Sequence, residues 1–272
     1  MSRETIRTTA VHNIATNGGQ VVLSRLIRYS PLFALALVWE VAGWAGILPQ
    51  YIPAFSTVVA ELGSRLIAGD MNVHTSTSLQ RVYVGFFGGS ALGILVGILA
   101  GRSTLIATLF DPVVSSTYPV PKIAIYPLLM VWLGIGFWST TAVIFLAAFY
   151  PVYISTYDGA RSVDKLHIWS AKNFNASRIE VLLKVVLPNC LTQIFSGLRV
   201  SLAISFIVLF AAELIASRSG LGHLVMMADR GNNYPLMFAA IAMIAILGFL
   251  HDRLLNAVRS RALYWERNTG GI

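Results

Sequence analysis

Three long stretches of this chain contain no Asp, Glu, Lys or Arg, and they constrain the fold more than any other feature. They run from Val82 to Gly101, from Ile123 to Tyr157 and from Gly231 to Leu250. A helix needs about 20 mostly apolar residues to cross a bilayer, so the first and last stretches each fit one crossing. The middle stretch holds 35 residues around a Gly134-Ile135-Gly136 break, which fits two short crossings joined by a tight turn. A soluble fold would need several buried helices with almost no polar faces, and we set it aside.

The composition agrees with a membrane protein, because charged residues make up 12% of the 272, about half of the ~25% typical of soluble domains. Pro31–Pro49 is apolar apart from Glu40, and Leu187–Ser217 is apolar apart from Arg199 and Glu213. Leu105–Tyr118 is shorter and interrupted, and we interpret it as an interfacial or re-entrant segment. The sequence therefore predicts an all-α polytopic membrane protein with about six transmembrane helices, at roughly 31–48, 82–101, 121–135, 137–156, 190–216 and 233–254.

The orientation follows from Lys and Arg, which are retained in cytoplasmic loops. With the N-terminus inside, fourteen of these residues fall on the cytoplasmic side and four outside, namely Arg65, Arg81, Arg218 and Arg230. Both termini and the loop 158–184 are thus predicted to be cytoplasmic. Topology and anionic lipid headgroups account for the net charge of +8 without a nucleic-acid partner. We expect a flexible cytoplasmic tail over 1–28, a membrane domain over 29–260 and a cytoplasmic C-terminal tail over 261–272.

Two residue types argue against other chemistry. Cys190 is the single cysteine, so no disulfide can form within the chain, and we interpret it as a small apolar residue in a span. The five histidines are scattered without the spacing of metal ligands, so no metal site is predicted.

Between the fourth and fifth predicted spans lies a charged segment, Trp169–Pro188, in an otherwise apolar region. Ser177 and Glu180 have the spacing of a capping box, in which each side chain satisfies a backbone N–H of the other. Asn175 tolerates the left-handed conformation that ends helices, and Pro188 ends or kinks the second helix. The pattern predicts a helix, a sharp turn and a second helix. The spacing alone leaves open an ordinary amphipathic loop on the membrane surface.

This segment resembles the cytoplasmic motif of permease subunits from bacterial binding-protein-dependent ABC importers. Their motif reads Glu-Ala-Ala, three residues, Gly, nine residues, Ile-x-Leu-Pro. The chain has Trp169-Ser170-Ala171, three residues, Asn175, nine residues and Val185-Val186-Leu187-Pro188, and Asn175-Ala176-Ser177-Arg178 resembles the family's Gly-Ala-Ser-Arg. It departs from the family in two places, since Trp169 replaces the acidic residue and Asn175 replaces the glycine.

Further pieces are similar to the nitrate/sulfonate/taurine branch of this family, and together they span roughly residues 31–265 in order. They are Tyr118-Pro119-Val120-Pro121, Pro127-Leu128, Trp132 to Gly136, Gly159 to Asp164, Ser196 to Arg199, Ala212-Glu213, and Ser219 to Gly222. The resemblance implies a fold like that of type I ABC importer permeases, with a coupling segment over 158–188, and a location in a bacterial inner membrane.

The resemblance also implies a role for each part. The residues that would couple to an ATPase are Trp169, Ser170, Ala171, Asn175, Ala176, Ser177, Arg178, Leu187 and Pro188. Two permease copies would form the translocation pathway, two ATPase subunits would dock beneath them, and an extracytoplasmic binding protein would deliver the solute. The chain has no G-x-x-x-x-G-K-[ST] phosphate loop, so no cofactor is expected in it, and the ATPase would bind ATP and Mg²⁺.

Residues that could handle the solute are less well marked. The candidates for the pathway are Tyr118, Tyr126, Trp132, Arg199 and Glu213, and Gly220 and Gly222 are candidates for an outer gate loop. A charge within the membrane needs a partner or a wet cavity, so Arg199 and Glu213 equally fit pairing with other helices, and Arg199 also fits a position at the lipid headgroups. Aromatic residues in spans often pack or anchor instead.

The expected function is therefore an ATP-driven import permease for a small solute, expected to be anionic, and the chain itself is not expected to be an enzyme. The alternative is a secondary transporter or channel driven by an ion gradient. Such a protein needs intramembrane acids that couple transport to the ion gradient, and the candidates in this sequence are Glu40, Glu213 and Asp111. Nitrate, sulfonates, taurine, aromatic carboxylates and vitamin precursors all remain open as solutes.

Overall fold

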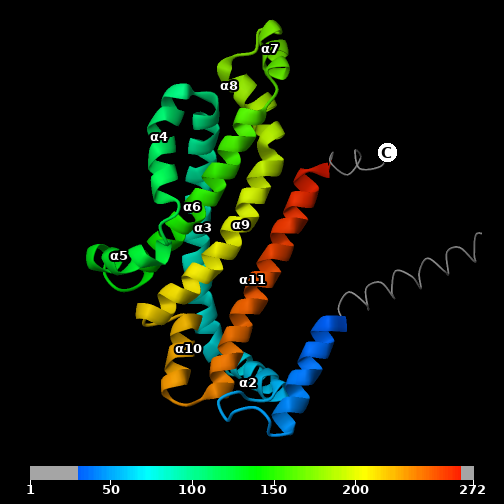
Figure 1. Ribbon diagram of the computed structural model, residues 1–272, viewed down its shortest axis with the longest axis vertical. Helices are drawn as coiled ribbons and strands as arrows, with labels where there is room; N and C mark the ends of the chain where they lie inside the picture. Colours follow the sequence, from blue (N-terminus) through cyan, green and yellow to red (C-terminus); the bar gives the residue numbers. More distant parts are fainter. Residues whose placement is uncertain (1–29, 265–272) are drawn as a thin grey trace, which may run out of the picture. The chain divides into compact units, whose positions relative to one another are not determined.

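The computed structural model describes residues 30–264, which form two compact units divided after Glu61 (Figure 1). The predicted N-terminal tail over 1–28 lies outside the described residues, as does most of the predicted C-terminal tail, from 265 to 272.

The first unit is built around a turn between two helices. An apolar helix, described over Ser30–Trp44, precedes the turn, and α2 (Phe55–Ala68) follows it. The carboxylate of Glu40 accepts hydrogen bonds from the Trp44 indole N–H (2.7 Å) and the Ser56 backbone N–H (2.8 Å). The second bond satisfies one of the free N–H groups in the first turn of α2. Glu40 thus connects the two helices, and each of its oxygens has a partner.

The core of the second unit consists of α3 (Asp70–Arg102), α6 (Phe137–Ser162) and α9 (Leu187–Ala216). The three helices run side by side and pack on one another (Figure 1). Side chains that point away from this core are apolar too, such as Phe87, 62% exposed, and Ile207, 67% exposed. A helix that is apolar on all sides belongs in a bilayer rather than in water.

A ladder of glycines allows α3 and α6 to approach closely. Gly85, Gly89, Gly93, Gly97 and Gly101 of α3 lie opposite the carbonyl oxygens of Thr141, Phe145, Phe149, Tyr153 and Tyr157 of α6, in that order. A Cβ on four of these glycines would come within 2.9 Å of the facing oxygen, and a Cβ on Gly89 would overlap it. Small residues four positions apart let membrane helices bring their backbones together, so the ladder explains why this helix pair dominates the core.

The helix α4 (Thr104–Thr117) folds back along α3 (Figure 1). Asp111 connects it to α6, since its carboxylate accepts hydrogen bonds from the Tyr153 hydroxyl (2.8 Å) and the Tyr157 hydroxyl (2.9 Å). Val114 of α4 packs with Ala100 and Tyr153 in an apolar cluster. The segment predicted as interfacial or re-entrant is therefore a helix of 14 residues.

The next segment consists of a short 3₁₀ turn, η1 (Lys122–Ile125), and α5 (Tyr126–Leu133). The Lys122 ammonium donates hydrogen bonds to the carbonyl oxygens of Thr117, Tyr118 and Val120 at 2.7, 3.0 and 2.9 Å. It thereby satisfies carbonyls that the end of α4 leaves free. Gly134, with φ of 77°, ends α5.

The last helices of the unit follow α9. A loop leads into α10 (Leu221–Arg230), and α11 (Tyr234–Ala262) then runs back to the end of the unit where α9 begins (Figure 1). Few residues of α11 are fully buried, namely Ala239, Ala240 and Leu247, and the others are half-buried or exposed.

The expected all-α membrane fold is confirmed, but the count of six spans is not. Among the described residues, four helices are long and apolar enough to cross a membrane, and they contain the spans predicted at 82–101, 137–156, 190–216 and 233–254. The segments predicted at 31–48 and 121–135 appear as shorter helices, Ser30–Trp44 and Lys122–Leu133. At 1.5 Å per residue, the second is roughly 18 Å long, against a hydrocarbon core of about 30 Å.

Candidate functional site

The coupling segment lies at one end of the second unit, beyond the C-terminal ends of α3 and α6, while α10 lies at the opposite end (Figure 1). It contains α7 (Lys165–Asn173), a turn, and α8 (Arg178–Val181). The Asp164 side chain caps α7, because its Oδ1 accepts the Leu166 backbone N–H at 2.8 Å. The predicted helix–turn–helix is therefore present.

The turn after α7 is a Schellman motif centred on Asn175. This residue has φ of 59°, in the left-handed region where Asn is tolerated better than most residues. Its backbone N–H donates to the Lys172 carbonyl (2.9 Å), and that of Ala176 donates to the Ala171 carbonyl (3.1 Å). These are the two hydrogen bonds that define the motif. Asn175 thus fills the position for which the family pattern has glycine.

The alanines of the motif point inward. Ala171 and Ala176 pack against an apolar cluster that includes Ile168 of α7, Val163 before α7 and Cys190 of α9. A hydrophobic contact between these two positions commonly accompanies the motif. The alanines therefore fix the turn against the membrane helices, and they leave other side chains to face outward.

The capping box predicted for α8 is also present. The Ser177 backbone N–H donates to Glu180 Oε2 (3.0 Å), and the Glu180 backbone N–H donates to Ser177 Oγ (3.2 Å). The Lys184 ammonium lies 3.0 Å from the other Glu180 oxygen. Both oxygens of this carboxylate are thus used within the segment.

A π-helical stretch, η2 (Leu182–Val186), joins α8 to α9. Its last hydrogen bond runs from the Leu187 N–H to the Leu182 carbonyl, five residues back. Pro188 has no N–H to donate and is tolerated in the first turn of α9. Pro188 was predicted to end or kink the second helix; the structure has a widened turn before it, and the helical path continues from Arg178 to Ala216.

Five large apolar side chains of the coupling segment face away from the molecule, and we call them the docking face. They are Leu166, Trp169, Phe174, Ile179 and Leu183, with exposed fractions of 64, 59, 85, 70 and 55%. Sequence reasoning included only Trp169 among them. The signal for the others was available, because an apolar residue within a charged segment has no reason to be exposed unless something covers it.

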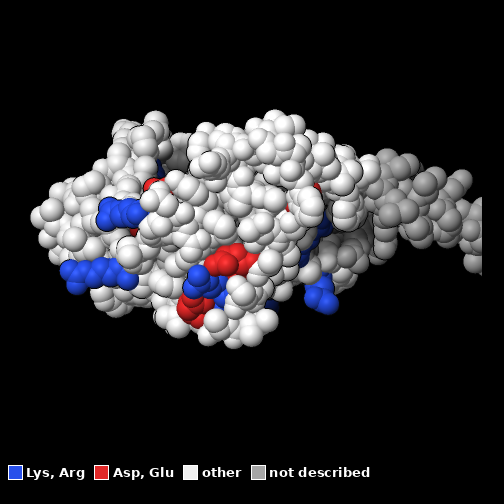
Figure 2. All heavy atoms as spheres, turned by 90° about the horizontal axis from the view of Figure 1, so that it is seen from below, with Lys and Arg blue, Asp and Glu red and all other residues white. Residues whose placement is uncertain are grey.

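At the opposite end of the unit, Glu213 of α9 is 1% exposed and forms an ion pair with Arg81 of α3, which is 3% exposed, at 2.7 Å. Ser78 Oγ donates to the same carboxylate at 2.9 Å, and so does the Gly222 backbone N–H. Arg81 was counted among the four basic residues outside; the structure places it within α3, which begins twelve residues before the apolar stretch, and buries it in this pair. Seen from this end, most of the surface carries no charged side chain (Figure 2).

The same cluster holds the loop that connects α9 to α10. The Arg81 guanidinium donates to the Ser219 carbonyl (2.8 Å), and the Gly220 N–H donates to His74 Nδ1 (3.2 Å). A Cβ on Gly220 would overlap the Glu213 carboxylate. The two predicted gate-loop glycines, Gly220 and Gly222, therefore lie directly against Glu213.

The aromatic pathway candidates lie in different environments. Tyr126 is fully buried, and its hydroxyl lies 3.1 Å from Thr140 Oγ1 and donates to the Ala216 carbonyl at 3.2 Å. Tyr118 is 49% exposed and Trp132 is 69% exposed. The latter two present free aromatic surface, whereas Tyr126 connects α5 to α6 and α9.

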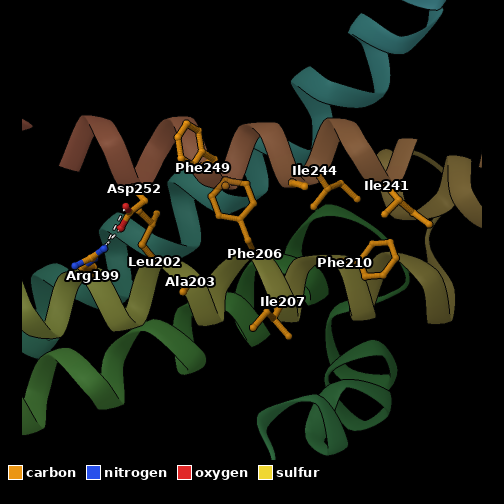
Figure 3. Close-up of a pocket in the computed structure, with 12 residues that line it drawn as sticks. Arg199, Leu202, Ala203, Phe206, Ile207, Phe210, Ile241, Ile244, Phe249 and Asp252 are labelled. Atoms are coloured by element: carbon orange, nitrogen blue, oxygen red, sulfur yellow. Dashed lines mark hydrogen bonds and ion pairs between the residues drawn. The ribbon is translucent and has the colours of Figure 1, made fainter. Parts of the chain in front are cut away.

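An apolar groove of about 460 Å³ separates α9 from α11 (Figure 3). Phe206, Phe210 and Ile244 lie along it, and Arg199 and Asp252 close one end with an ion pair of 2.8 Å. The Arg199 side chain is 56% exposed. Asp252 is a partner that sequence reasoning missed, although it is the acid nearest the end of an apolar stretch. Within the described residues, no group of His, Cys, Asp and Glu could hold a metal ion.

Comparison with known proteins places this arrangement in a family. Residues 93–264 match the family described as binding-protein-dependent transport system inner membrane component. The chain is 37% identical to the taurine transport system permease protein TauC of Escherichia coli over 85% of its own length and 86% of that protein. It is 33% identical to the putative aliphatic sulfonates transport permease protein SsuC of Bacillus subtilis, over 86% and 85%.

The fold also matches a solved structure, an inward-facing conformation of the MetNI methionine ABC transporter. The TM-score is 0.60, with 17% identity over 70% of this chain and 94% of that one. The all-helical fold, the coupling segment and the sequence matches agree. The chain belongs to the family of binding-protein-dependent transport system inner membrane components, the permease subunits of ABC transporters.

Proposed function

We propose that this chain is the membrane-spanning subunit of an ATP-driven importer for a small organic anion of the sulfonate class. The observation that carries the proposal is the coupling segment, a rigid helix–turn–helix whose docking face has no partner within the described chain. The similarity to taurine and aliphatic sulfonate permeases supports the solute class.

Two copies of the chain would enclose the pathway, and a separate ATPase, which holds ATP and Mg²⁺, would bind each coupling segment from the cytoplasm. An extracytoplasmic binding protein would deliver the solute at the α10 end. In this arrangement α11 ends on the cytoplasmic side, because its C-terminal end and the coupling segment lie at the same end of the second unit (Figure 1). The N-terminus is proposed to be cytoplasmic as well.

The mechanism follows from the way the coupling segment is held. Ile168 and Ala176 pack on the same cluster as Ile98 of α3, Ala160 of α6 and Ile194 of α9. A displacement of α7 by the ATPase would therefore move the cytoplasmic ends of three helices together. Such rigid-body movement, biased by a ligand on a partner, is a common way to gate a site.

The pathway candidates differ in what they offer a solute. Arg199, Tyr118 and Trp132 have exposed side chains that two facing copies could share, and the Arg199 guanidinium is the cationic group among them. Tyr126 and Glu213 are buried, so we propose that they shape the pathway rather than contact the solute. Gly220 and Gly222 would hold the outer loop closed through their contacts with Glu213.

An ion-gradient-driven transporter is less well supported. Glu213 is paired with Arg81, Asp111 accepts two tyrosine hydroxyls, and Glu40 accepts the Trp44 and Ser56 N–H groups. Coupling to an ion requires an acid that can gain and lose that ion. Each candidate acid is already engaged by protein groups.

Reconstitution into liposomes with the co-purifying ATPase and a sulfonate-binding protein tests the proposal. We expect uptake of the sulfonate to require internal ATP, and liposomes with this chain alone to take up none under an ion gradient. Ala176→Trp should displace the turn and abolish both uptake and stimulated ATP hydrolysis, while insertion in the membrane persists. Asn189→Trp, at an exposed position in α9, is the control. Gradient-driven uptake by the chain alone would contradict the proposal.

A further inference from the structure

The docking face combines apolar and cationic groups. Trp169 and Phe174 expose more than half of their surfaces, and Leu166 and Trp169 lie three residues apart on the outer side of α7, opposite the buried Ile168. Lys165, Lys172 and Arg178 are also exposed. None of these three cations has an ion-pair partner among the described residues.

The carboxylates of the same region are few and are at least partly used within the segment. Beyond α6, the coupling segment has two of them, Asp164 and Glu180. Asp164 accepts the Leu166 N–H, and Glu180 accepts the Ser177 N–H and pairs with Lys184. Trp169 occupies the position where the resemblance led us to expect an acid. The face therefore presents positive charge around an aromatic centre.

We propose that, if the ATPase coupling proposed above holds, the docking face inserts Trp169 and Phe174 into an apolar cleft of the ATPase whose rim carries carboxylates. Aromatic side chains bury about 150–250 Å² each and dominate the energetics of interfaces. Unpaired cations at the edge of the face call for acidic groups opposite them. A basic group in the cleft would lose its hydration facing Trp169 and gain no ion pair, which is costly.

A membrane surface rich in anionic lipid would also place negative charge opposite the cations of the docking face. The structure favours a protein partner, because α7 lies beyond the ends of α3, α6 and α11 (Figure 1), and therefore away from a headgroup layer at those ends. The turn is also rigid, since Asn175 and Ala176 are held by the two hydrogen bonds of the Schellman motif. A rigid projection suits a preformed cleft.

The test measures the affinity of the full chain, in nanodiscs of neutral phosphatidylcholine, for the ATPase with which it co-purifies. We expect Trp169→Ala and Phe174→Ala each to weaken binding about tenfold or more, and Trp169→Glu to weaken it further through repulsion by the acidic rim. Ile67→Ala, at a position that is 90% exposed in α2, is the matched control and should leave the affinity unchanged.

Salt provides the second measurement. Raising the salt concentration should weaken the wild-type complex, because it screens exposed charges. The triple variant Lys165→Gln, Lys172→Gln, Arg178→Gln should bind more weakly at low salt and lose most of the salt dependence. If the salt dependence of this variant equals that of the wild type, the inference that the cleft has an acidic rim is wrong.

Other outcomes separate the inference from the proposed function. If Trp169→Glu binds as well as the wild type or better, the cleft supplies a base and the inference is wrong, although the ATPase still binds. If the charge variant has an effect only in nanodiscs that contain phosphatidylglycerol, the cations face lipid, which also overturns it. If the wild-type chain retains no ATPase in any lipid, it is the proposed function that fails.

Discussion

The two ends of the second unit contain the same kind of backbone turn but differ in what surrounds it. Asn175 ends α7 with φ of 59°, and Asn232 follows α10 with φ of 52°. Each turn has the two hydrogen bonds of a Schellman motif, from Asn232 to Asp229 and from Asn233 to Ala228 in the second case. At the coupling end large apolar side chains such as Phe174 are exposed beside the turn, whereas the opposite end also holds a polar pair, Arg81 and Glu213, that is buried at the start of α10. One end thus leaves apolar side chains exposed, which the proposed ATPase would cover, whereas the other end buries an ion pair that is completed internally.

The largest expected effect is at the internally completed end. Arg81→Met would leave Glu213 buried without its cation, and the loss of one partner of a buried pair costs about 3–5 kcal/mol. The matched control is Arg65→Met, whose partner Asp70 is half exposed and for which we expect at most about 1 kcal/mol. Denaturant unfolding in detergent measures both. Equal losses would mean that the Arg81–Glu213 pair is not desolvated as the structure has it.

A second variant probes the loop at that end. Gly220→Ala should cost about 1–2 kcal/mol for the positive φ of 109°, and about 1–3 kcal/mol more because its Cβ overlaps Glu213. Gly69→Ala also places Ala at a positive φ, 88°, but with open space around it, so it shows the cost of a positive φ without an overlap. Thermal unfolding of the two variants should differ. If they unfold alike, the loop is free to move away from Glu213.

The smallest effect is the sharpest test of the comparison. Asn175→Ala and Asn232→Ala should each cost about 1–2 kcal/mol, because both place Ala in the left-handed region. Only Asn175→Ala should also reduce stimulated ATP hydrolysis, since the docking face adjoins that turn. Asn175→Gly and Asn232→Gly, which tolerate the same φ, serve as controls and should restore both properties. A loss of ATPase stimulation in Asn232→Ala would contradict the expectation that only the turn at Asn175 affects the ATPase.

Local features are predictable from this sequence because their signals lie close together along the chain. The turn at Asn175, the cap at Ser177 and the effect of Pro188 each depend on neighbours within five positions. The buried Arg81–Glu213 pair joins residues 132 positions apart, and an arginine at the edge of an apolar stretch fits a loop as well as a helix. The sequence therefore did not show that Arg81 lies within a helix and is buried.

Two further features show where composition alone is insufficient. The segment 121–135 is apolar enough for a span, yet the left-handed backbone at Gly134 stops α5 after Leu133. Apolarity gives the environment of a segment but not its helical length. The glycines at every fourth position from Gly85 are visible in the sequence and predict close packing of one helix face, but they do not say that α6 is the partner.

The π-helical stretch between α8 and α9 changes the angle around the helix axis at which the neighbouring side chains point. Val181 and Val186 are both buried in one cluster although they lie five positions apart, and Cys190 and Ile194 continue the same stripe at intervals of four. In an unbroken α-helix, at 3.6 residues per turn, five positions would carry a side chain about 140° around the axis. The wide turn thus acts as a one-residue insertion that realigns two stripes. Deleting a residue from 182–186 would rotate Ile179 by about 100° relative to the membrane helix, and the docking face would point elsewhere with every one of its residues intact.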